Sequence, residues 1–260
     1  MPLFARFKNN RLFRLITPAA ALAVACVDFV WMMRVRSHLE WFALGIVVAA
    51  VLGALFLFHQ HRQTENALHG ATFAVLLGAG GFAFILEDAR ILRVLTGSIT
   101  VLAFAILLGS EAKFVLTEPL WKWCRSIRPA VLLITVFIIG VGAAAAATFL
   151  RVPPTVVGLA AFIPFVVILL ADLHTERGFS FEVVATSILG SILITEYLIA
   201  LLVFPLTFSV VGAFIAIASS AFRESSLRMA RGVFTLKFGL AMLALVVGSL
   251  VLLLGSSRWS

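Results

Sequence analysis

Two carboxylates fall inside long apolar stretches of the sequence, where charged groups are costly. They are Asp28 and Glu196. A charge at the centre of a bilayer costs roughly 2.5–3.5 kcal/mol on the insertion scale, so such residues usually serve a function. Arg93, near the start of another apolar stretch, is a candidate counter-ion. Together these three residues predict a polar site for proton-coupled transport or for a small polar ligand.

Depth supports a common location for the two acids. Asp28 lies about 12 residues into its stretch and Glu196 about 14 into its own, which places them roughly 18 and 21 Å deep. If both helices run outward, both acids lie in the outer half of the membrane. A structural interpretation stays open: Asp28 then extends towards water near Trp31 and Arg34, and Glu196 stays protonated in a helix contact.

A second group of polar residues has the spacing of a metal site. His61, Glu65 and His69 are four residues apart and share one face if their segment is helical. Imidazole and carboxylate are ligands that zinc accepts. The alternative is an ordinary polar loop.

Glycine and proline mark a third candidate region. Gly78, Gly80 and Gly81 lie close together in one apolar stretch, and Pro164 lies in the middle of another. An unwound segment or a kink at these residues would form a hinge or line a pathway. The alternative is close helix packing through small residues.

The amino-acid composition indicates which kind of secondary structure positions these residues. The chain has 260 residues, of which 62% are hydrophobic and 12% charged, whereas a soluble domain has about 25% charged residues. This favours an all-α, polytopic transmembrane helix bundle in a single membrane domain, 1–260. The net charge of +8 belongs to loops rather than to one basic face, so we expect no nucleic-acid partner.

A crossing needs about 20 apolar residues. Nine candidate spans meet this requirement: 16–33, 41–58, 67–86, 91–109, 130–150, 155–171, 182–204, 206–222 and 235–255. Pro205 separates the seventh from the eighth and suits a tight hairpin there. An eight-span alternative omits the eighth segment or inserts it only halfway. The long loop 110–129 is either an interfacial helix or a plain basic connector.

Charge and tryptophan fix the orientation. With a cytoplasmic N-terminus, 14 of the 20 Lys and Arg residues lie on the cytoplasmic side, as the positive-inside rule requires. All five tryptophans then fall at membrane boundaries; they are Trp31, Trp41, Trp121, Trp123 and Trp259. The segment before Cys26 resembles a lipoprotein cleavage site, but its apolar stretch continues to Met33, so we expect an uncleaved span.

Three classes of function remain. The first is a transporter or permease-like bundle with the outer polar site. The second is a non-catalytic membrane subunit that docks other membrane proteins, and the third is an intramembrane enzyme acting on a lipid-linked substrate. The sequence has no HExxH, GxSxG or Walker-type motif, so nothing supports catalysis, and we expect no cofactor. The expected location is the plasma membrane of a prokaryote, with the lipid bilayer as the main partner.

Overall fold

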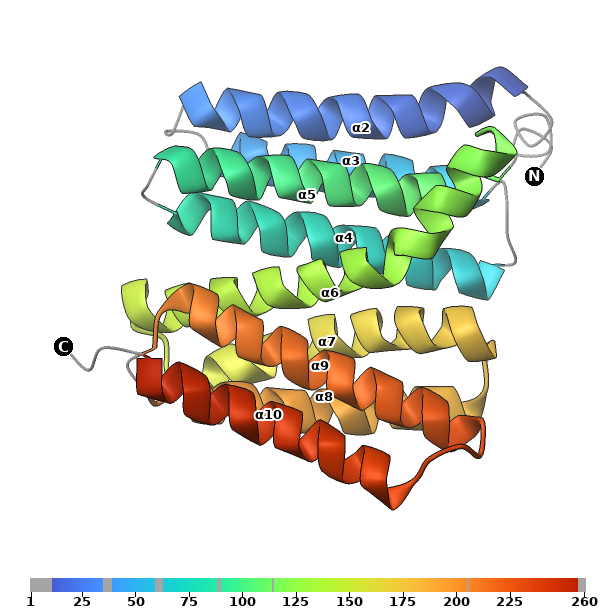
Figure 1. Cartoon of the computed structure of the whole chain (residues 1–260). Coiled ribbons are helices and arrows are strands. Elements are labelled where there is room, and N and C mark those ends of the chain that lie inside the picture. The colour runs from blue at the N-terminus through green and yellow to red at the C-terminus, as the bar shows by residue number, and fades with distance from the viewer. Residues whose placement is uncertain are drawn as a thin grey trace. The chain divides into compact units, whose positions relative to one another are not determined.

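A computed structural model describes residues 11–34, 39–58, 63–87, 90–113, 115–204 and 206–256. Every regular element in these ranges is an α helix, and the helices run back and forth along the chain (Figure 1). The predicted all-α bundle is therefore confirmed. The chain forms two compact units, residues 1–131 and 132–260.

Unit 1 is built from helices that pack in chain order. They are α2 (Arg11–Arg34), α3 (Leu39–Phe58), α4 (Gln63–Leu86), α5 (Arg90–Glu111) and the first part of α6 (Glu118–Phe149). Helix α2 packs on α3, α3 packs on α4 and α4 packs on α5, and α5 also contacts α2. Three buried rings join these helices: Phe29 lies 5.3 Å from Phe42 and 5.1 Å from Phe84, centroid to centroid. Aromatic side chains at this spacing add specific contacts to an apolar core.

Unit 2 contains the rest of α6 and four further helices. They are α7 (Pro154–Arg177), α8 (Phe181–Leu202), α9 (Phe208–Ala230) and α10 (Leu236–Ser256). Helix α8 packs on both α7 and α9, and α9 packs on α10. Ser187 and Ser191 are fully buried on α8, and their hydroxyls each donate to a carbonyl one turn earlier at 2.7 Å. Both hydroxyls are therefore satisfied within their own helix, as expected for a packing surface.

Eight of the described helices, α2 to α9, are long and apolar enough to cross a membrane. The eighth predicted span, which the eight-span alternative omitted, forms α9. It is a helix separate from α8, since α8 ends at Leu202 and α9 begins at Phe208. Pro205 itself lies outside the described residues. The shorter candidate is α10, whose described apolar part runs from Leu236 to Gly248.

Four of the five tryptophans lie near helix ends, where membrane boundaries are expected. Trp31 is near the end of α2, Trp41 near the start of α3, and Trp121 and Trp123 in the first turns of α6. Trp259 lies outside the described residues.

Helix α6 is longer than the predicted span. It covers 32 residues, begins at Glu118 and continues through Pro129. The second half of the predicted loop 110–129 is therefore helical and continuous with the span. Figure 1 shows this first part of α6 crossing α4 and α5 obliquely. The indole of Trp121 donates to the carbonyl of Ser110 at 2.9 Å, which ties α6 to the end of α5.

Candidate functional site

Asp28 is buried between two helices of unit 1. Only 7% of the residue is exposed, and its carboxyl group lies directly against Gly45 of α3, where a Cβ would overlap it. Its Oδ2 has no hydrogen-bond partner in the described part of the chain. The extended position towards water is therefore not the one observed. An oxygen placed in this way can hold a proton or accept a hydrogen bond from a solute.

Arg93 caps the C-terminal end of α4. It is buried on the first turn of α5, and its Nε donates to the carbonyl of Glu87 at 2.9 Å. A second guanidinium nitrogen donates to the same carbonyl, and the group lies 6.0 Å from the ring of Phe84. A cation at the end of a helix satisfies carbonyls that lack intrahelical donors. Phe84 in turn lies 5.1 Å from Phe29, centroid to centroid, and Phe29 follows Asp28 in the sequence.

Glu196 belongs to unit 2 and lies on an exposed face of α8. It is exposed on α8, within an apolar stripe that includes the exposed Leu189 and Leu193. The opposite face of α8 carries the buried Ser187 and Ser191. Convergence of Glu196 with Asp28 and Arg93 stays a prediction.

Three buried polar side chains meet at the other end of unit 1, and the sequence did not reveal this cluster. They are His69 of α4, Glu111 of α5 and Arg128 of α6, each 5–6% exposed. Arg128 forms an ion pair with Oε1 of Glu111 and lies 2.9 Å from Nδ1 of His69. Because a guanidinium carries only donors, this contact requires Nδ1 to be the acceptor. The imidazole also lies 3.6 Å from Glu111.

One signal in the sequence pointed towards this cluster. Glu111 and Arg128 lie near the two ends of the loop 110–129, and an apolar stretch adjoins each end. Opposite charges at the two ends of one connector can meet when the adjoining helices pack as neighbours. The helical extension from Glu118 brings Arg128 into the bundle. The sequence left open an interfacial helix or a plain connector here, and neither interpretation predicted a continuation of the span.

The metal site stays a prediction. His61 lies outside the described residues, and Glu65 lies in α4 with a side chain that is not described. His69 faces Arg128 instead, which occupies one of its two ring nitrogens. Within the described ranges, no three His, Cys, Asp or Glu side chains form a group that could hold a metal ion.

The glycines of α4 lie in unbroken helix. A Cβ on Gly80 would overlap Thr100 of α5, and one on Gly81 would overlap Ile46 of α3, whereas Gly78 faces open space. Two of the three glycines thus allow close packing. Pro164 likewise lies inside the continuous helix α7. Their role as a hinge or pathway stays a prediction.

Ion pairs join α7 and α9 in unit 2. Arg223 lies 2.6 Å from a carboxylate oxygen of Asp172 and 3.7 Å from one of Glu176. Arg231 lies 3.5 Å from the other oxygen of Glu176.

No family model matches this chain, and no curated protein or solved structure is detectably similar to it.

Proposed function

We propose that this multi-pass membrane protein is a transporter of the permease type, in which Asp28 carries a proton or binds a small polar solute. The observation that supports this proposal is the burial of Asp28 against Gly45 with Oδ2 unpaired within the described ranges. An intramembrane carboxylate that faces the bundle interior is typical of proton and solute pathways. A purely structural carboxylate would be expected to have both oxygens paired.

Buried charged residues at the two ends of α5 also support a transport function. Arg93 and Glu111 are both buried, and 18 residues of helix separate them, which corresponds to about 27 Å. In the orientation with a cytoplasmic N-terminus, Arg93 lies at the outer end and Glu111 at the inner end. A transporter must close each end of its pathway in turn. Buried polar contacts at both ends of one helix are suited to that task, because breaking them requires a discrete change.

Proteoliposomes provide the test. We expect concentration jumps of small polar solutes, applied to purified protein on a solid-supported membrane, to produce currents that protein-free liposomes lack. Asp28→Asn should reduce the current at least tenfold, whereas Asp28→Glu should retain part of it. Glu118→Gln is the matched control, because this carboxylate is exposed at the start of α6. Currents of equal size in the wild type and in Asp28→Asn would contradict the role of Asp28.

Glu196 favours a second candidate, a non-catalytic membrane subunit. Its carboxylate lies in an outward apolar stripe, where lipid solvates a charge poorly. A partner helix with a hydrogen-bonding group at this position would offset that cost. A photoreactive residue at Leu193 should then form an adduct in native membranes that Glu196→Leu abolishes. The same residue at the exposed Leu159 of α7 is the control.

A further inference from the structure

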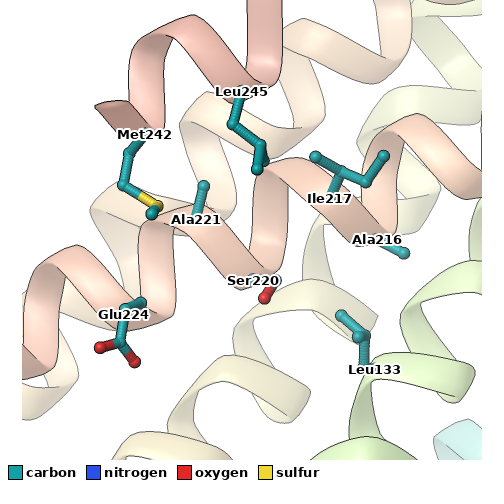
Figure 2. A pocket seen from close by; sticks show the side chains of 8 residues that line it. All are labelled: Leu133, Ala216, Ile217, Ser220, Ala221, Glu224, Met242 and Leu245. Atoms are coloured by element: carbon teal, nitrogen blue, oxygen red, sulfur yellow. The ribbon is translucent and has the colours of Figure 1, made fainter. Parts of the chain in front are cut away.

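A pocket of about 320 Å³ lies in unit 2 between α6, α9 and α10. Figure 2 shows Leu133 of α6, Ile217 of α9 and Leu245 of α10 around it. The volume is at the lower end of those that hold small ligands. This lining suits a hydrocarbon chain, because six of its eight residues are apolar.

One side of the pocket is formed by a single face of α9. Ala216, Ser220 and Glu224 all line it and follow one another at four-residue intervals, so they form one stripe along the helix. The stripe is about 12 Å long. Ala216 lies at one end and Glu224 at the other (Figure 2). The pocket is thus an elongated apolar groove with a carboxylate at one end.

A positive and a negative charge lie side by side at that end. Nε of Arg228 is 2.9 Å from Oε1 of Glu224, and both side chains are half-exposed. The guanidinium also lies 3.9 Å from the ring centroid of Phe238, which brings it to the start of α10. A guanidinium has five donors and a carboxylate about four acceptor sites, so this single contact leaves both able to bind a further group. With a cytoplasmic N-terminus, this end of α9 lies at the depth of the inner headgroups.

We propose that the groove binds one acyl chain of a phospholipid whose headgroup carries both a phosphate and a primary amine. The acyl chain lies along Ala216 and Ser220, the phosphate accepts from Arg228, and the amine donates to Glu224. The paired charges at the rim match a zwitterion better than a net anion. A primary ammonium donates hydrogen bonds to a carboxylate, which a quaternary ammonium cannot do. This site lies in unit 2 and is independent of the transport role of Asp28 in unit 1.

Native mass spectrometry of the full chain in detergent tests the proposal. Phosphatidylethanolamine, phosphatidylcholine and phosphatidylglycerol with identical acyl chains are titrated separately. We expect phosphatidylethanolamine to bind at least tenfold more tightly than the other two. Glu224→Gln should remove this preference, and Ser220→Leu, which fills the groove, should weaken binding of phosphatidylethanolamine at least tenfold. Ala160→Leu on the exposed face of α7 is the matched control and should bind as the wild type does.

Each opposite result overturns the proposal. Equal binding of phosphatidylcholine would show that the headgroup is not recognised, and tighter binding of phosphatidylglycerol would show a site for anionic lipid. Wild-type binding by Ser220→Leu would place the lipid outside the groove. Soluble glycerophosphoethanolamine carries the headgroup without chains, so its binding with equal affinity would exclude the acyl-chain site. If Ser220→Leu does not fold, as judged by thermal unfolding, Glu224→Gln still decides headgroup recognition.

Discussion

The guanidinium of Arg128 lies 2.9 Å from Nδ1 of His69, although 59 residues separate the two in the sequence. Glu111 contacts both of them, so one buried cluster joins α4, α5 and α6. Paired charges in a protein interior stabilise little on balance, but removing one partner leaves the other charge buried and uncompensated. A substitution within this cluster should therefore affect stability far more than one in an exposed ion pair.

Glu111→Ala tests this expectation. It leaves Arg128 without its counter-ion, and we expect the free energy of unfolding to fall by about 3–5 kcal/mol. Equilibrium unfolding in mixed micelles with increasing SDS measures the change. The double variant Glu111→Ala/Arg128→Met should lose less, because no unpaired charge remains.

The control is the exposed pair of Glu118 and Lys122, whose nitrogen and oxygen lie 2.6 Å apart. Glu118→Ala should cost less than about 1 kcal/mol, because solvent screens an exposed pair. Equal losses for Glu111→Ala and Glu118→Ala would show that burial of the cluster contributes nothing.

Gly45→Ala should displace the carboxyl group of Asp28. The new Cβ would overlap that group, and overpacking of this kind costs about 1–3 kcal/mol. The same SDS titration measures the loss, and Asp28→Ala in the same chain should recover most of it.

Gly78→Ala is the matched control on a neighbouring helix, since a Cβ there meets nothing within 4 Å. It should leave stability unchanged or raise it by up to about 1 kcal/mol through better helix propensity. The close contact between Gly45 and Asp28 would be refuted by identical effects of the two substitutions.

The spans were predictable from the sequence because length and hydropathy decide them. All nine apolar stretches became helices, with most ends displaced by a few residues. The segment from Glu118 was harder, because Pro129 removes one hydrogen bond and usually marks a break. The helix nevertheless continues, and Trp121 anchors its start on Ser110. That contact is tertiary and has no counterpart in local sequence.

The site was predictable only in part. Hydropathy identifies Asp28 and Glu196 as costly, but it does not show which face of an almost wholly apolar helix points inward. The structure places Asp28 in the interior of unit 1 and Glu196 on an exposed face of α8 in unit 2. The contact between His69 and Arg128 could not be predicted either. Arg128 is distant from His69 in the sequence and approaches it only through the packing of α6.

Helices α6 and α9 approach at two glycines, and this contact should be intolerant of side chains. A Cβ on Gly212 would lie 2.8 Å from the carbonyl oxygen of Phe137, and one on Gly140 would lie 2.9 Å from Cα of Gly212. Backbone atoms cannot move aside as a flexible side chain can. Gly212→Ala should therefore lower the midpoint of SDS unfolding, whereas Gly248→Ala, in open space, should not. An unchanged midpoint for Gly212→Ala would mean that the two helices do not rely on this contact.

Thiol labelling tests the orientation and the separate crossing of α9. In a background without Cys26 and Cys124, single cysteines are placed at Phe181, Thr207 and Val233, all of which are exposed near helix ends. With a cytoplasmic N-terminus, a membrane-impermeant maleimide should label Thr207→Cys in intact cells. It should reach Phe181→Cys and Val233→Cys only after permeabilisation, because α8 and α9 each cross once. The inverse pattern would reverse the orientation. Labelling of positions 207 and 233 from the same side would show that α9 does not cross, whatever its length and composition.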